Sequence, residues 1–373
     1  MYEPIPGNKI FEALHDHPTI VMACNTRVTK GIVKGILKAA KKMDAPIIIE
    51  IAKSECNINV GYTGYAPKTF AEAVKLVAQE AQHDIWALHA DHIGIKKGTP
   101  EELEETRQLI KSQIDSGFTS FAIDASHLFD TSAKTEKEQL RENIRCTTEM
   151  ARYIEQNTQG REFGLEVEVG EIGKKDAQGN VITSPEEAVT FISELEKSGV
   201  KPHVLAIANG STHGNIYDEQ GNLIEQVSID IPRTKAVVKA LKDNGFNVRV
   251  AQHGITGTPI DLIATKFPHG DIIKGNVGTY WQNIFYDVLK THNPVLYQKI
   301  WDWVLQNYKK PEKKDLETFG KNAKYALKQF FNEIYAMSKG MELALESEAY
   351  NNAIKLLKAF KSEGYASEVR KLL

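Results

Sequence analysis

Short apolar segments recur along the chain up to residue 276, and longer amphipathic segments separate them. The short segments are rich in valine, isoleucine and alanine, which is typical of strands buried on both faces of a parallel sheet. Strands are predicted at residues 19–25, 46–52, 85–91, 119–126, 163–169, 203–208, 247–252 and 271–276. The amphipathic segments predict helices at residues 29–42, 67–82, 99–116, 135–157, 185–198, 232–244, 259–266 and 280–290.

This alternation predicts the fold class α/β, as a (β/α)8 TIM barrel over residues 1–292. A doubly wound open sheet is the main rival, but no GxGxxG follows the first strand, where a dinucleotide-binding fold would carry it. After residue 292 the strand pattern stops. Residues 293–373 are predicted to form a C-terminal helical extension, with helices at 295–308, 314–338 and 343–363. The extension could pack on the barrel wall or on a second subunit.

The composition narrows the class of protein. The chain has 373 residues, of which 42% are hydrophobic, and this is enough apolar surface for a folded core. A formal net charge of -3 offers no general field for nucleic acid or an anionic membrane. Three cysteines without a CxxC pair fit a reducing compartment, and no segment has the pattern of a signal peptide or a membrane span. We therefore expect a cytoplasmic protein.

Three histidines stand at the ends of separate predicted strands: His92, His213 and His253. The strands of a parallel barrel all end at one rim, so the three imidazoles are expected to meet there. Asp91 precedes His92, and such a carboxylate can orient a metal ligand or transfer a proton. The strand must end in a turn at Ile93 for His92 to share the face of Asp91. Because neutral imidazoles bind Zn²⁺ well, the pattern predicts a metal site, with hydrogen-bonded histidines as the alternative.

Carboxylates accompany the histidines. Asp124 ends the fourth predicted strand, and Glu166 and Glu168 alternate along the fifth, so both face one side, predicted to be the barrel interior. Buried acids are costly unless they are paired or bound to a cation, which leaves a structural pair as the alternative to a metal. The polar loop at residues 170–183 could bring Glu171 or Asp176 over the site as an acid or base.

Glycine-rich loops follow the last three predicted strands. The late loops of this barrel commonly bind phosphate through backbone N–H groups, although each loop alone could be an ordinary turn. The candidates for contact with a phosphorylated substrate are Gly214, Gly254, Thr256, Lys274, Asn276 and Thr279.

The motifs HADH, AIDAS, EVEVG, STHG, HGITG and KGNVGT occur in an order that resembles the class II, zinc-dependent ketose-bisphosphate aldolases. The stretch Gly61–Gly64 (GYTG) resembles instead the accessory subunit of tagatose-bisphosphate aldolases, a non-catalytic relative, so we expect a divergent branch. The resemblance implies a lyase that reversibly cleaves fructose 1,6-bisphosphate to dihydroxyacetone phosphate and glyceraldehyde 3-phosphate, as in glycolysis and gluconeogenesis. It also implies Zn²⁺, replaceable by another divalent ion and assisted by a monovalent cation.

The same resemblance implies a role for each matching residue. His92, His213 and His253 would ligate zinc, and Asp91 would be the acid/base that serves the aldehyde oxygen. Asp124 and Glu168 would support the ligands or form an alternative metal position. The substrate contacts would be Gly214, Gly254, Thr256 and Thr279 at one phosphate, Asn276 at the ketose carbons and Ser54 at the other phosphate.

Three positions depart from the family pattern. The loop at 173–176 reads GKKD where the family carries GGxE, so Asp176 is the aligned acid and is one methylene shorter. Ile255 replaces a small residue in the phosphate loop. Gly278 replaces the Asp, Asn or Ala that usually follows Asn276-Val277, and this could change how a substrate hydroxyl is recognised.

Several alternatives stay open. The substrate could be tagatose 1,6-bisphosphate or another ketose phosphate, and the chain could be a non-catalytic partner subunit. A lysine-based aldolase would need Lys274 with a lowered pKa. A zinc hydrolase would usually carry HxH on the first strand, which this chain lacks. In every enzymatic case the expected partner is a small sugar phosphate, with no nucleic acid or membrane, and the expected assembly is a homodimer or higher homo-oligomer.

Overall fold

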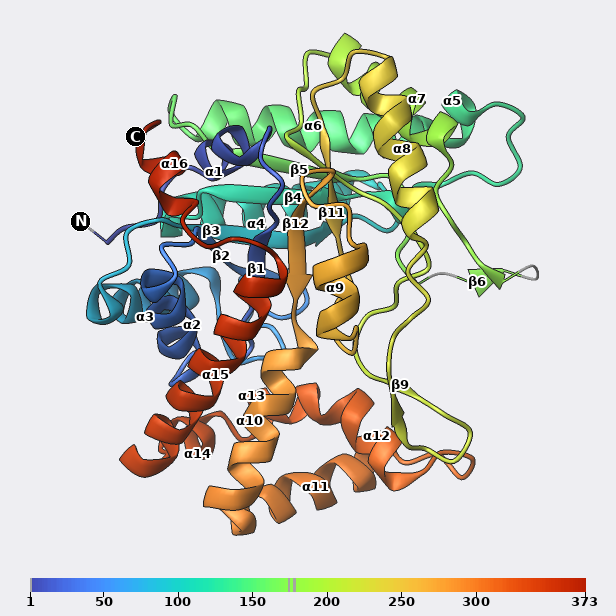
Figure 1. The fold of residues 1–373 in the computed structure, drawn as a ribbon. Coiled ribbons are helices and arrows are strands. Elements are labelled where there is room, and N and C mark those ends of the chain that lie inside the picture. The colour runs from blue at the N-terminus through green and yellow to red at the C-terminus, as the bar shows by residue number, and fades with distance from the viewer. Residues whose placement is uncertain (1, 174, 177–178) are drawn as a thin grey trace.

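A closed barrel of parallel strands forms the body of the protein. The computed structural model describes residues 2–173, 175–176 and 179–373. Within them eight strands pair in the order β1-β12-β11-β8-β5-β4-β3-β2, and the last pairs with the first. Figure 1 shows the strands at the centre with helices around them. The strands are β1 Val21–Asn25, β2 Ile47–Ala52, β3 Trp86–Gly94, β4 Ser120–Asp124, β5 Gly164–Glu168, β8 Val204–Ala206, β11 Arg249–Gln252 and β12 Ile272–Val277. The predicted TIM barrel is confirmed, and each predicted strand is present.

Helices connect the strands and cover the barrel. They are α2 Ile32–Lys42, α3 Pro67–Ala81, α4 Pro100–Ser116, α5 Glu136–Gln139, α6 Arg141–Asn157, α7 Pro185–Lys197, α8 Ile231–Asp243, α9 Ile260–Lys266 and α10 Thr279–His292. The predicted helix at 135–157 is divided into α5 and α6. Helix starts follow their sequence signals: the Thr99 side chain accepts a hydrogen bond from Glu102 N and caps α4.

Two packed layers hold the barrel together. The outward faces of the strands pack against the helices, while small inward residues such as Ala23, Ala87 and Ala251 fill the interior. An N-terminal helix that the apolar pattern did not predict, α1 Gly7–Leu14, packs on the interior residues. Its Phe11 and Leu14 are buried in that cluster, so α1 closes one end of the barrel and leaves the carboxyl ends of the strands open.

The C-terminal extension is helical, as predicted, and it packs on the barrel wall. Its elements are α11 Pro294–Tyr308, α12 Asp315–Asn322, a 3-10 turn η2 Ala323–Tyr325, α13 Ala326–Gln329, α14 Phe331–Tyr335, α15 Lys339–Ala359 and α16 Ala366–Arg370. The single helix expected at 314–338 is wrong, because the chain turns there between short pieces. Helix α15 lies along α2, and α16 lies beside α1 (Figure 1). The boundary at residue 292 stays a prediction, since one hydrophobic core joins both parts.

Short hairpins project from the barrel rim. Strands β6 Lys175–Asp176 and β7 Gly179–Asn180 form one, and β9 Ile216–Tyr217 and β10 Leu223–Ile224 form the other. No helix in the described ranges is long and apolar enough to cross a membrane. The three cysteines are buried and unpaired.

Candidate metal centre and substrate pocket

A β-bulge in β3 brings Asp91 and His92 to the same face. Ala90 pairs with Phe121 of β4 and Ile93 pairs with Ile123, so three steps along β3 match two along β4. His92 has a φ of 41°, in the left-handed region that non-glycine residues rarely adopt. A bulge of this kind redirects a side chain and is frequent near active sites. The turn expected at Ile93 is wrong, because the strand continues to Gly94.

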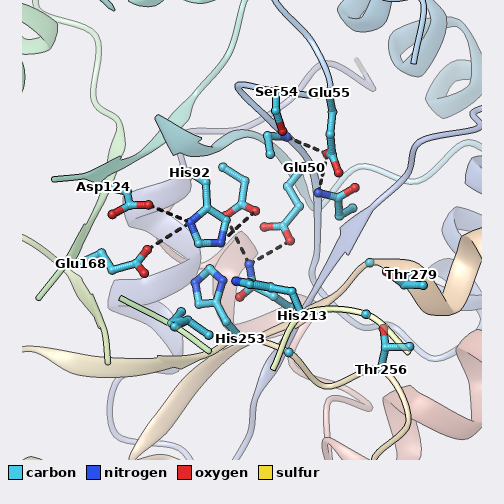
Figure 2. A pocket seen from close by; sticks show the side chains of 18 of the residues that line it. Glu50, Ser54, Glu55, His92, Asp124, Glu168, His213, His253, Thr256 and Thr279 are labelled. Carbon is cyan, nitrogen blue, oxygen red and sulfur yellow. Dashed lines mark hydrogen bonds and ion pairs between the residues drawn. The ribbon is translucent and has the colours of Figure 1, made fainter. Parts of the chain in front are cut away.

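The three predicted histidines converge at the mouth of the barrel (Figure 2). The ring centroid of His92 lies 4.5 Å from that of His253 and 5.2 Å from that of His213, and the remaining pair is 6.1 Å apart. Two imidazoles on one tetrahedral zinc ion, with Zn–N bonds of about 2 Å, would have centroids about 5 Å apart. The spacing of the rings therefore fits a shared divalent ion.

The donor atoms around His92 also fit a metal. Donor atoms of Asp91, His92 and His253 lie within 4.8 Å of one another. The Nε2 atom of His92 is buried and has no hydrogen-bond partner among the described residues, which is costly for a polar atom unless a cation occupies the space before it. His213 belongs to no such close group and lies exposed at the edge of the mouth.

The second nitrogen of the His92 ring, Nδ1, faces two acids. It lies 3.3 Å from Asp124 Oδ2 and 3.1 Å from Glu168 Oε2. Metal-bound histidines usually donate their second ring N–H to a carboxylate in this way. Burial raises the pKa of Glu168, and the charge of Asp124 adds to the effect, to about 8. Burial opposes ionisation of Asp124, but its hydrogen bond to His92, the charge of that ring and the hydrogen bonds from Ser126 together outweigh this and lower the pKa of Asp124.

Asp91 lies beside the His92 ring, on the side of the barrel interior. Asn276 Nδ2 donates to Asp91 Oδ1 at 3.3 Å and to Glu50 Oε1 at 2.9 Å. Burial disfavours the charge of Asp91, but His92 and Lys274 outweigh it and lower its pKa to about 2. Burial and the neighbouring Asp91 raise the pKa of Glu50 to about 8. Asp91 is thus the ionised member of this pair at neutral pH.

Lys274 lies beneath the mouth rather than in it. Its side chain is fully buried, and its ammonium contacts Glu166 Oε2 at 2.7 Å and Glu50 Oε2 at 3.0 Å. Lys274 is absent from the described residues that line the cavity, so its position does not support the predicted contact with a substrate phosphate. Burial disfavours its charge, but Glu166 and Glu50 outweigh it and raise the pKa of Lys274, the opposite of what a Schiff-base lysine requires.

A cavity of about 360 Å³ opens above the histidines. The predicted residues Gly214, Gly254, Thr256, Asn276 and Thr279 line it, from the ends of the last strands, the loops after them and the start of α10. Thr279 is the first residue of α10, and the N–H groups at a helix N-terminus attract anions. Ser54 lines the cavity from the loop after β2, and Figure 2 shows it at a different edge from Thr256 and Thr279.

Further residues of the cavity wall had no role assigned from the sequence, among them Arg27 and Lys324. Arg27 Nε donates to Glu55 Oε1 at 2.7 Å, and Arg27 also donates to Thr279 Oγ1 at 3.2 Å. The Tyr62 hydroxyl donates to the same Glu55 oxygen at 2.7 Å. Lys324, from η2 of the C-terminal extension, lies 5.8 Å from the centre of the Tyr62 ring. Arg27 follows a strand end and could have been noticed for that reason, whereas nothing in the helical tail marks Lys324.

The two candidate loop acids differ in what the structure describes. Glu171 lines the cavity, and its Oε1 atom lies 3.6 Å from His127 Nε2. Asp176 ends the short strand β6, but its side chain lies outside the described part of the structure. Of the two, Glu171 is the acid that lines the described cavity.

Comparisons with known proteins relate the sequence and the fold of this chain to aldolases. The sequence model of the family Fructose-bisphosphate aldolase class-II matches residues 6–341. A fructose-bisphosphate aldolase of Giardia intestinalis is 27% identical over 261 residues, which cover 69% of this chain and 67% of that protein. The fold is similar to the YdjI aldolase of Escherichia coli K12, with a TM-score of 0.62 and 18% identity over 97% of this chain and 99% of that one. A fructose-bisphosphate aldolase of Campylobacter jejuni gives a TM-score of 0.60 and 19% identity over 95% and 96% of the two chains.

Proposed function

This chain belongs to the class II fructose-bisphosphate aldolase family, and we propose from that premise that it is a zinc-dependent aldolase of a ketose bisphosphate. As a member of this family it is a lyase that acts on carbon–carbon bonds. The leading substrate is fructose 1,6-bisphosphate, cleaved reversibly to dihydroxyacetone phosphate and glyceraldehyde 3-phosphate. Tagatose 1,6-bisphosphate or another ketose phosphate is the alternative.

The convergence of the three imidazoles carries the proposal, together with the buried Nε2 atom of His92, which has no hydrogen-bond partner among the described residues. Imidazole and carboxylate donors suit zinc, and His92, His213 and His253 would hold it. When bound, Zn²⁺ would act as a Lewis acid on the ketone oxygen of the substrate. His213 is the outermost of the three, so it is the ligand that we expect to move on metal binding.

The protein's own groups would move the protons. In the cleavage direction the C4 hydroxyl of the ketose loses a proton as the C3–C4 bond breaks, and the Asp91 carboxylate would accept it. A loop acid, Glu171 or Asp176, would return a proton to the carbon of the dihydroxyacetone phosphate half. Asn276, held by Asp91 and Glu50, would contact the ketose carbons.

Two ends of the cavity support a substrate with two phosphates. Gly214, Gly254, Thr256 and Thr279 would hold one phosphate through backbone N–H and hydroxyl groups at the start of α10. Ser54 would contact the other phosphate. Lys324 and Arg27 add two positive charges to the same cavity, and Glu55 compensates the charge of Arg27.

Location and assembly follow from the same proposal. A fructose 1,6-bisphosphate aldolase would serve glycolysis and gluconeogenesis, and the buried, unpaired cysteines are compatible with the cytoplasm. We propose a homodimer or higher homo-oligomer as the assembled form. Sedimentation of the purified protein would measure its mass.

One experiment tests the metal, the reaction and the substrate together. Metal analysis of the purified protein should find about one zinc ion per chain, held by the donor set described above. Release of dihydroxyacetone phosphate should then be measured from fructose 1,6-bisphosphate, tagatose 1,6-bisphosphate and fructose 1-phosphate. Activity should disappear in EDTA and return with Zn²⁺, and His92→Ala should lose the metal and about a hundredfold or more of the rate.

The matched control is His127→Ala, which removes a histidine that lines the cavity but whose ring is not among the three that lie together. It should keep its zinc. Full activity in EDTA would refute the metal mechanism. A parental protein that binds no metal and cleaves none of the three sugars would favour the non-catalytic partner subunit instead. Cleavage of tagatose 1,6-bisphosphate alone would correct the substrate and leave the reaction class intact.

A further inference from the structure

A buried cation lies beneath the candidate metal centre. Lys274, on β12, is fully buried, and its Nζ atom lies 2.7 Å from Glu166 Oε2 and 3.0 Å from Glu50 Oε2. The same atom lies 3.2 Å from His89 Nε2 and 3.7 Å from Asp91 Oδ1. A buried ammonium is costly unless it is enclosed by charged and hydrogen-bonding partners, and here partners surround it. The surroundings of Lys274 are thus complete without a substrate.

Glu166 connects this cation to a candidate metal ligand. One carboxylate oxygen of Glu166 accepts from Lys274, and the other lies 2.8 Å from His253 Nε2. His253 Nε2 is therefore the donor to Glu166, which leaves Nδ1 as the nitrogen available to a metal. A carboxylate that accepts from the second nitrogen of a metal-bound histidine fixes the tautomer and orientation of that ring.

Geometry separates this arrangement from a catalytic role for the lysine. Lys274 does not line the cavity among the described residues, so its amine cannot attack a substrate carbonyl. Its shortest route to the candidate centre runs through Glu166, in the sequence Lys274–Glu166–His253, with each contact at 2.8 Å or less, whereas its contact with Asp91 Oδ1 is longer, at 3.7 Å. A change at Lys274 should therefore be felt at His253 before it is felt by the substrate.

We propose that Lys274 is a positioning residue, an internal cation that holds Glu166 in place and so orients the His253 imidazole toward the metal. The proposal rests on the metal centre proposed above and assigns Lys274 a place in it. The lysine acts through Glu166, so removing either residue should produce the same defect, and removing both should add nothing further.

The test is a double-mutant cycle read by metal affinity. Lys274→Met and Glu166→Gln should each weaken Zn²⁺ or Co²⁺ binding by about tenfold or more, measured by competition with a chromophoric chelator. The double variant should bind no more weakly than Glu166→Gln alone. The double variant also removes the two opposite charges together. It should therefore fold even if Lys274→Met, which leaves acids without a compensating cation, does not fold.

The matched control is Glu50→Gln, which removes another partner of Lys274; Glu50 contacts Lys274 and Asn276 rather than His253. It should leave the metal affinity within about threefold, because the path through Glu166 is intact. A Lys274→Met protein that binds metal as tightly as its parent would overturn the proposal. So would a double variant whose loss is the product of the two single losses.

A second readout works without metal and separates the two proposals. In chelator-treated, ¹⁵N-histidine-labelled protein, the His253 signals should report a protonated Nε2 that donates to Glu166. Lys274→Met should shift those signals, and an unchanged His253 would contradict the positioning role even if the parental protein binds no metal. Metal binding by the parent with unchanged His253 signals would leave the proposed function standing and remove only this inference.

Discussion

At the scale of single residues, the mouth of the barrel contains two pairs of acids that differ in charge. Glu50 lies near Asp91, and Glu168 lies near Asp124. Burial and the like charge of the aspartate raise the pKa of each glutamate to about 8, while histidine neighbours lower the pKa of each aspartate. Acids in close pairs commonly separate in this way, because two like charges cannot both be accommodated in a dry site. The ionised aspartates are therefore the groups that can accept a proton at neutral pH.

A buried histidine remote from the mouth gives a prediction about pH and stability. His83 is 1% exposed, its Nε2 atom lies 3.0 Å from the Ile85 carbonyl oxygen, and burial lowers its pKa to about 4. In the unfolded chain this histidine binds a proton near pH 6.5. The folded protein is therefore most stable above pH 6.5, and this part of its stability is lost as the pH falls toward 4. The loss should reach about 3 kcal/mol.

His83→Gln should remove this part of the pH dependence, because its amide can still donate to Ile85 but does not titrate. The measurement is the free energy of unfolding in urea at pH 7 and pH 4.5, with chelator present. His292→Gln, a change at an exposed histidine of α10, should keep the parental pH dependence. A His83 variant that loses as much stability in acid as its parent would contradict the prediction.

Residues that end a strand could be predicted from the sequence, and others could not. Asp91 and the three histidines stand where apolar runs give way to polar residues, and the barrel brings such positions to one rim. Glu50 was missed because it lies inside the apolar run of β2, where a single acid has no polar neighbours to mark it. Lys274 was placed at the rim because its motif is there, but its side chain points inward from β12.

At the scale of elements, the bulge in β3 brings two neighbouring side chains to one face, which a regular strand cannot do. Regular alternation would direct Asp91 and His92 to opposite faces. The extra residue between Ala90 and Ile93 places both at the mouth, and His92 adopts a φ of 41° to do so. Such a backbone costs of order 1–3 kcal/mol and persists where the surroundings fix it. A period-two pattern reveals neither the bulge nor this conformation.

A glycine where two loops touch gives a prediction at the same scale. Gly254 has a φ of +66°, and a Cβ atom there would lie 2.6 Å from the Thr212 carbonyl oxygen, which is backbone and cannot rotate away. Gly254→Ala should therefore displace the loop after β8 as well as its own. We expect a loss of about 2–3 kcal/mol in stability and a rise of about tenfold in KM for the bisphosphate.

Gly199→Ala is the matched control, since Gly199 has a φ of +82° but open space around the added atom. It should cost about 1 kcal/mol from backbone strain alone and leave KM unchanged. The free energy of unfolding and the KM of both variants would be compared. Equal losses in the two proteins, with KM unchanged in both, would show that Gly254 is needed only for its backbone freedom.

At the scale of the whole molecule, the C-terminal extension is part of the barrel's stability. Helix α15 packs along α2, and after it Phe360 O accepts from Ile20 N at 3.0 Å while the Ser362 hydroxyl donates to Ile20 O at 2.6 Å. The same extension brings Lys324 to the cavity. The amphipathic pattern predicted its helices but left open whether they cover the barrel or a second subunit, because an apolar face does not identify its partner.

The contact between α2 and α15 can be tested with two helical glycines, one facing the other helix and one in open surroundings. A Cβ atom at Gly35, on α2, would lie 2.3 Å from Glu346 O and 2.8 Å from Ala349 Cβ, both on α15. Gly35→Ala should improve helix propensity by about 1 kcal/mol but force α15 away, for a net loss of about 2–3 kcal/mol. Gly340→Ala, in the first turn of α15, meets no closer atom than Ser338 Oγ at 3.9 Å and should stabilise by about 0.5 kcal/mol.

Urea unfolding would measure the free energy of unfolding of both variants. The two changes should have opposite signs only if α2 and α15 touch as closely in solution as they do at Gly35. A Gly35 variant stabilised as much as the Gly340 variant would mean that α15 is free to leave the wall, and Lys324 could then no longer be counted as a fixed part of the cavity.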